Sequence, residues 1–166
     1  MDKGTAIIGI IILLLCIVPF VIMHYNTKKR KQKILAVLKK AALKDHHIID
    51  QHDVWSHSAI GLCTDLQYLY GIRIFGEQVN VFVADLSLYN KCTVHTEKRT
   101  QDIDGEKYSF PEKISLHFSN SNSSVSFEIY NTEVDSLTIT DEINLAEKWK
   151  HIANDCIKGL NPAYRA

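Results

Sequence analysis

The sequence predicts an α+β protein with one transmembrane helix at its amino end, and three observations support this class. Residues 5–23 are apolar over the length of a bilayer. The middle of the chain alternates apolar and polar residues with the period of two that strands require, and the carboxy end returns to a helical period. With 166 residues, the chain has room for one domain and an appendage.

The apolar segment, TAIIGIIILLLCIVPFVIM, contains no charged side chain. As a helix it would extend about 28 Å, close to the ~30 Å hydrocarbon core of a bilayer. A buried core helix would usually keep a polar face, and a cleaved signal peptide would have a shorter apolar run with small residues at its end. We therefore expect an uncleaved single span over residues 5–23, with residues 1–4 as a short external tail.

Positive charges follow this segment directly. Only Lys3 precedes it, whereas five bases follow closely: Lys28, Lys29, Arg30, Lys31 and Lys33. Because Lys and Arg resist translocation, this asymmetry predicts that the carboxy-terminal body lies in the cytoplasm. A second interpretation of the same membrane-proximal cluster is attraction to anionic lipid headgroups.

Residues 24–45 are predicted to form a basic amphipathic stalk helix. No Gly or Pro occurs between positions 27 and 44, and the apolar residues recur at helical spacing. They are Ile34, Leu35, Leu38, Ala41 and Ala42. This helix could continue the span as a stalk, cover the domain behind it or form a dimer seam.

Residues 46–160 are predicted to form a β-rich domain, with 161–166 as a tail. Strands are expected at 47–50, 54–62, 67–75, 78–86, 91–97, 113–119 and 125–131, with a shorter one at 137–140. The polar residues 120–124 predict a hairpin turn between the last two long strands. The charged segment 98–112 contains Gly105 and Pro111 and is expected to be a long exposed loop.

The carboxy end is predicted to be an amphipathic helix. Asp141 or Thr140 can cap it, and Gly159 with Pro162 can end it. Its apolar face must cover apolar surface elsewhere. That face comprises Leu145, Ala146, Trp149, Ile152, Ala153, Cys156, Ile157 and Leu160.

The hairpin ISLHFSNSNSSVSFEIYN followed by the helix LAEKWKHIANDCI, behind a single span, resembles bacterial membrane-anchored pleckstrin-homology-like domains. The resemblance implies a bent antiparallel sheet or partly open barrel of about seven strands, capped by the terminal helix. Trp149, Ile152, Cys156 and Ile157 would be the plug. A cell (inner) membrane is the implied location, and an adaptor for headgroups, peptides or partner domains is the implied role.

The sequence departs from that family at one point. Headgroup-binding members carry bases in the loop that joins the first two strands, whereas residues 62–66 contain none and include Asp65. The helix at 27–44 also fits a second fold, a cone-shaped α+β sheet with helices in front, as in single-span components of bacterial secretion machinery.

Chemical motifs are sparse. Four histidines lie close in sequence, but positions five apart on a strand face opposite sides, so no metal site is expected. They are His46, His47, His52 and His57. No Cys-x-x-Cys, phosphate loop or catalytic signature occurs, and no cofactor is expected.

Two further groups of residues carry weaker signals. A nucleophilic Cys92 could meet His95 or His117 across strands, although it would need a third, orienting group. Five aromatic residues could line a groove, but core packing is the expected role, since aromatic residues populate strands. They are Trp55, Tyr68, Tyr70, Phe82 and Tyr89.

From Asp45 onward ten bases face eighteen acids, which disfavours nucleic-acid binding. The sequence therefore predicts a non-enzymatic docking or scaffolding module for a protein partner or a second copy, binding through an open strand edge or beside the terminal helix. An anionic-lipid sensor that uses the basic stalk and a small His/Asp-based metal-dependent hydrolase are the alternatives.

Overall fold

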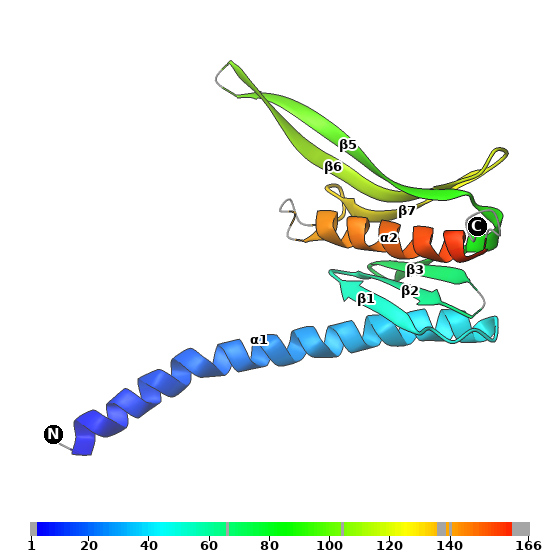
Figure 1. Cartoon of the computed structure of the whole chain (residues 1–166). Coiled ribbons are helices and arrows are strands. Elements are labelled where there is room, and N and C mark those ends of the chain that lie inside the picture. The colour runs from blue at the N-terminus through cyan, green and yellow to red at the C-terminus, as the bar shows by residue number, and fades with distance from the viewer. Residues whose placement is uncertain (1–2, 66, 104, 136–138, 140, 161–166) are drawn as a thin grey trace.

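A computed structural model describes residues 3–65, 67–103, 105–135, 139 and 141–160 (Figure 1). Over these residues the chain is α+β, as expected. The elements are α1 (Lys3–Lys44), β1 (Gln51–Trp55), β2 (Ser58–Cys63), β3 (Tyr68–Phe75), β4 (Gln78–Asp85), η1 (Leu86–Leu88), β5 (Lys91–Ile103), β6 (Glu106–Ser119), β7 (Ser124–Asn131) and α2 (Glu142–Leu160).

The strands form two antiparallel sheets, with orders β1-β2-β3-β4 and β5-β6-β7. Among the described residues there are seven strands, the number that the resemblance implies, but no ladder joins β4 to β5 and no closed barrel forms. The change of sheet occurs at η1, where Asp85 caps the short helix by accepting a hydrogen bond from the Ser87 backbone at 3.0 Å. This turn carries the chain from one sheet to the other.

Two strand predictions near the start of the domain are wrong. Residues 47–50 lie outside any strand, because α1 ends in a turn in which His46 adopts a φ of 61°. The predicted strand 54–62 is two strands joined at Ser56 and His57, and Ser56 adopts a φ of 39°. The loop joining the first two strands is therefore not 62–66, although the observed loop also lacks Lys and Arg.

The predicted loop at 98–112 is also wrong, because this segment continues the β5–β6 hairpin. Pairing extends from Lys98 and Pro111 to the last pair beside Gly105, whose φ of 84° suits the tight turn. A register shift between Glu97 and Lys98 leaves Glu112 as a bulge. The predicted strand 137–140 lies outside the described residues apart from Ile139.

Two apolar cores hold the domain together. The larger core joins both sheets to α2 around Trp149, Phe118 and Leu116. The smaller core lies between α1 and the first sheet, where Ile34 and Leu38 are buried with four other residues. Figure 1 shows α1 lying along that sheet, so this part of α1 covers the domain, one of the three roles considered for it. The residues that complete this core are Ala42, Ala59, Tyr70 and Ile72.

Within the part of the chain that the structure describes, no helix combines the length and hydropathy needed to cross a bilayer. Residues 5–23 belong to α1, but the side chains at positions 5–12, 14, 19, 20 and 23 lie outside the described residues. The transmembrane span therefore stays a prediction.

Candidate docking surfaces

The outer edge of β4 is the most apolar open edge among the described strands. β4 pairs only with β3, and residues 78–84 carry no charge. Val79, Val81 and Val83 are 43%, 51% and 45% exposed. They are cross-strand partners of Ile74, Ile72 and Tyr70, so they share the face that α1 covers over its neighbouring strands.

The backbone of the same three valines points away from β3. The Ile74 N–H points toward β2, because it donates to His57 O at 2.9 Å. Every second residue of β3, beginning with the neighbour of Ile74, therefore directs its backbone N–H and C=O groups toward β4. Arg73 is one of these, and its partner is Asn80. The backbone N–H and C=O groups of Val79, Val81 and Val83 therefore lie at the open edge, where an added strand could form hydrogen bonds with them.

The distal part of the β5–β6 hairpin is a second open surface. This arm, residues 98–111, leaves the body as a two-stranded ribbon (Figure 1). β7 pairs with β6 only as far as Lys113, so within the described residues the arm has no third strand. Tyr108 and Phe110 stack on one face with ring centroids 6.4 Å apart and are 44% and 48% exposed.

The start of the β5 edge is closed by α2. The Asn154 side chain accepts a hydrogen bond from the Cys92 N–H at 2.9 Å and donates one to the Cys92 carbonyl at 2.8 Å. The backbone groups of Cys92 therefore point away from β6, and those of Lys98, Thr100 and Asp102 do so as well. Within the described structure, that distal stretch of the edge has no cover.

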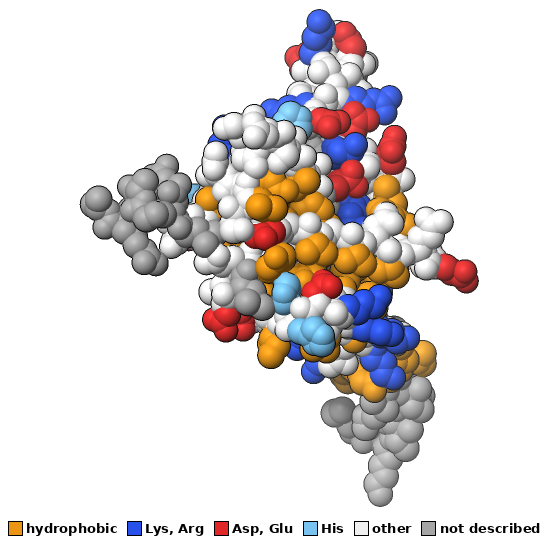
Figure 2. Space-filling view, turned by 90° about the vertical axis from the view of Figure 1, so that its right-hand side faces the viewer, with side chains coloured by type: hydrophobic (Ala, Val, Ile, Leu, Met, Phe, Trp, Pro, Cys, Tyr) orange, Lys and Arg blue, Asp and Glu red, His pale blue; other side chains and the backbone are white. Residues whose placement is uncertain are grey.

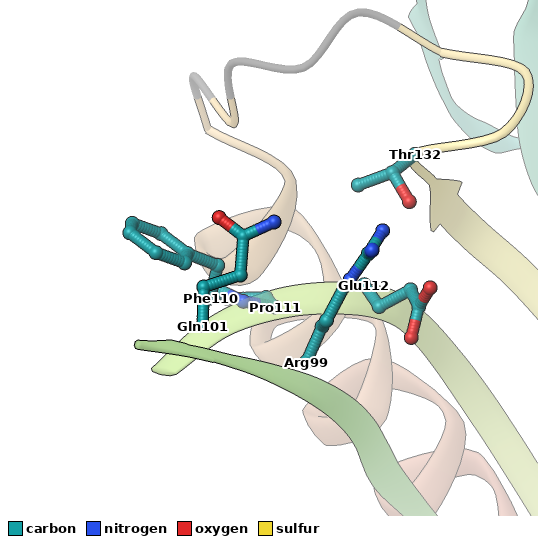
Figure 3. A pocket seen from close by; sticks show the side chains of 6 residues that line it. All are labelled: Arg99, Gln101, Phe110, Pro111, Glu112 and Thr132. Carbon is teal, nitrogen blue, oxygen red and sulfur yellow. The ribbon is translucent and has the colours of Figure 1, made fainter. Parts of the chain in front are cut away.

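A small pocket lies at the base of the arm, where the chain leaves β7 (Figure 3). Its volume is about 210 Å³, below the ~300–1,000 Å³ of most small-molecule sites. Polar and apolar side chains share its lining. They are Arg99, Gln101, Phe110, Pro111, Glu112 and Thr132.

The predicted basic cluster is exposed on α1. This applies to all five side chains, and the Lys29 ammonium lies 4.6 Å from the ring centroid of Tyr25. Figure 2 shows positive side chains gathered low on one face of the molecule and both signs intermixed higher up. The members of the cluster are Lys28, Lys29, Arg30, Lys31 and Lys33.

The predicted plug residues all face the larger core. Trp149 is fully buried, and its indole N–H donates to Asp53 Oδ2 at 2.7 Å. Ile157 is buried, whereas Ile152 and Cys156 are partly buried against the same cluster. These side chains thus serve packing between α2 and both sheets.

The four histidines do not converge, and no group of three potential metal ligands occurs among the described residues. His47 Nδ1 lies 2.6 Å from the Tyr70 hydroxyl, which donates to Asp45 at 3.0 Å. Because that hydroxyl has one proton, His47 Nδ1 must be the donor of the first bond. Burial raises the pKa of Tyr70, and the hydrogen bond to Asp45 raises it further. The two hydrogen bonds tie the turn after α1 to β3.

Cys92 is not an activated nucleophile. Burial raises its thiol pKa to about 12, which leaves almost no thiolate at neutral pH. His95 lies three residues along the same strand, and His117 pairs with Thr93, so both occupy the opposite face from Cys92. The aromatic residues considered for a groove pack against the two cores, as expected.

Sequence reasoning missed the polar residues that join the elements. Arg73 Nη1 lies 2.9 Å from Glu128 Oε1, and Arg73 Nη2 lies 2.8 Å from Asp135 Oδ2, so β3 is tied to β7 and to the turn after it. Arg73 stands between two isoleucines, which was a weak signal. Asn154 gave no signal, because nothing nearby marks its contact with Cys92.

No family model, curated protein or solved structure matches this chain.

Proposed function

We propose that this chain is a single-pass membrane protein whose β-rich domain is a non-enzymatic, cytoplasmic docking module for a protein partner. The observation that carries the proposal is the β4 edge. Natural edge strands usually carry charges, prolines or bulges that prevent pairing, and β4 has none of these between positions 78 and 84. An extended segment of a partner could add to this edge and cover the three valines.

A second copy is a poor occupant for β4. Antiparallel pairing of two β4 strands requires a two-fold axis perpendicular to the sheet. Because α1 lies along that sheet, this axis would point the two α1 helices in opposite directions (Figure 1). Two anchors could not then enter the same bilayer, so we assign β4 to a different protein.

The membrane assignment is supported by the apolar segment 5–23 and by the five bases that follow it. The family resemblance stays a prediction and is supported by the order of one long amino-terminal helix, seven strands and one terminal helix. Among the described residues no group of three or more potential metal ligands gathers.

Site-specific photo-crosslinking of the full-length protein in its native membranes tests the docking role. A photoreactive residue at Val81 should yield a covalent adduct with a partner protein, because Val81 lies at the centre of the open edge. The matched control carries the same residue at Lys158, which is exposed on α2. Equal labelling at both positions, or none at Val81, would contradict the proposal.

Recognition of an anionic membrane surface by the basic cluster is the second candidate, favoured by the exposure of all five side chains. Replacing the cluster with Gln in a fragment of residues 24–166 should abolish sedimentation with liposomes that contain anionic lipid. Binding that survives this replacement would count against the sensor, and the original fragment with neutral liposomes is the control. The residues to replace are Lys28, Lys29, Arg30, Lys31 and Lys33.

A further inference from the structure

We propose that the arm is a homotypic contact, in which the distal β5 edges of two copies pair antiparallel about Thr100. The inference goes beyond the docking role of β4 and rests on the proposed function only for the membrane anchorage. Lys98, Thr100 and Asp102 direct their backbone groups to this edge, as the contact between Asn154 and Cys92 establishes for the strand. Each of the three can exchange hydrogen bonds with an opposing strand.

The side chains of this stretch are self-complementary. A two-fold axis at Thr100 places Thr100 opposite Thr100 of the second copy, and Lys98 opposite Asp102 of that copy. Each dimer would contain the Lys98–Asp102 pair twice. Moving the axis to Lys98 or to Asp102 would oppose like charges instead, so the charges select the register.

The other edge of the arm fits a second copy less well. Pro111 on β6 has no N–H to offer. In addition, the Thr132 N–H donates to the Glu112 carbonyl at 3.0 Å, so the chain leaving β7 occupies the position where an incoming strand would continue. The β5 edge has neither obstacle until Asn154 closes it at Cys92.

The geometry of the arm also differs from that of β4. Figure 1 shows the arm on the opposite side of the domain from α1. Two copies anchored in one bilayer can pair through their arms when the two-fold axis, which is perpendicular to the arm, runs along the membrane normal. Such a short paired stretch buries much less than the ~1,200 Å² of a stable soluble interface. Anchoring in one membrane raises the effective concentration of the two arms and makes a weak contact useful.

Cysteine cross-linking of the full chain in liposomes tests the register. Thr100→Cys should give a disulfide-linked dimer, because hydrogen-bonded partners on antiparallel strands have Cα atoms about 5.5 Å apart, within disulfide range. The matched control is Ser109→Cys, since Ser109 pairs with Thr100 inside the arm but lies on β6. Both variants carry Cys16→Ser and Cys156→Ser, which remove the two native thiols that are not buried.

Charge reversal tests the pairing independently. In the Thr100→Cys background, Lys98→Glu opposes two carboxylates at each end and should lower the dimer yield about fivefold. The double variant Asp102→Lys/Lys107→Glu keeps opposite charges on these two cross-strand partners. It also removes the hydrogen bond that Asp102 accepts from the Gly105 N–H in the turn, and it should lower the yield similarly. Mixing the two differently tagged proteins should restore cross-linking as a heterodimer.

Three results would overturn the homotypic contact. The first is cross-linking through Ser109→Cys instead of Thr100→Cys, and the second is no cross-linking of either cysteine variant. The third is a dimer yield that does not change when the charges at positions 98 and 102 are reversed. None of these affects the adduct expected at Val81 with a partner protein. Loss of the Val81 adduct with retained Thr100→Cys dimers would instead reject the docking role of β4 and keep the arm contact.

Discussion

At the scale of single residues, Arg73 is the one charged residue that is buried in the described part of the chain. Its side chain is 6% exposed and contacts both Glu128 and Asp135. Ion pairs removed from water contribute little net stability when complete, but removal of one partner leaves uncompensated charge. Arg73 is therefore a structural link between the sheets.

Replacement of Arg73 with Met should lower the free energy of unfolding by about 3–5 kcal/mol, because the Asp135 carboxylate loses its cation. The matched control is Lys113→Met, which removes an outer cation 3.7 Å from Glu128 and should cost less than about 1 kcal/mol. Denaturant unfolding of both variants checks this. Equal losses in the free energy of unfolding for the two variants would show that the buried position of Arg73 does not increase the importance of its ion pairs.

Gly71 allows close packing of the two sheets. A Cβ built there would lie 2.4 Å from the Phe127 ring. Gly71→Ala should therefore cost about 1–3 kcal/mol through overpacking. Gly159→Ala, at a helical position with no heavy atom within 4 Å of the added Cβ, should instead stabilise by about 0.5–1 kcal/mol. Thermal melting of the two variants should give shifts of opposite sign.

The apolar periodicity predicted which side chains of α2 face the core, including Trp149 and Ile157, because that pattern is local. The partners of Arg73 and Asn154 are distant in sequence: Glu128 lies 55 residues from Arg73, and Cys92 lies 62 residues from Asn154. Periodicity contains no information on such contacts. The open backbone groups of β4 and the arm also depend on which strands become neighbours.

At the scale of elements, α1 joins two environments. Its amino-terminal part contains the predicted span, whereas Ile34, Leu38 and Ala42 belong to the smaller core. The hydrophobic pattern identified the helix correctly but left three roles open. Only the packing of β1–β3 against it selects the role of cover.

Truncation of Leu38, which is fully buried, should test this cover. Leu38→Ala is expected to lower the free energy of unfolding by about 2–5 kcal/mol through the cavity it leaves. Leu43→Ala, at a position 61% exposed on the same helix, should change it by no more than about 0.5 kcal/mol. Losses of similar size would mean that α1 acts as a stalk detached from the sheet.

The arm shows why one prediction failed. In the sequence, Gly105 and Pro111 favour a loop. In the structure, Gly105 lies in the turn between β5 and β6, and Pro111 lies beside a bulge, where a missing N–H is tolerated. Charged residues along 98–112 strengthened the loop interpretation. They are compatible with a ribbon exposed on both faces, because such strands need no alternation.

At the scale of the whole molecule, burial of the Cys92 thiol makes stability depend on alkaline pH. Its pKa is raised from 9.0 to about 12, so the folded state holds the proton more tightly than the unfolded state. The contribution of the protonated Cys92 thiol to the free energy of unfolding is fully present below pH 9 and is lost as the pH rises toward 12. The melting temperature should fall over this interval, and less steeply for Cys92→Val; parallel curves would contradict the assignment.

The continuity of α1 from Lys3 to Lys44 has a mechanical consequence. The carboxy-terminal turns of this helix pack against the first sheet, so no flexible linker separates the domain from the proposed anchor within α1. Changes in bilayer thickness alter the tilt of a spanning helix. Thinning or thickening of the lipid would therefore redirect β4 and the arm together, and lipid composition could control which encounters between molecules are productive.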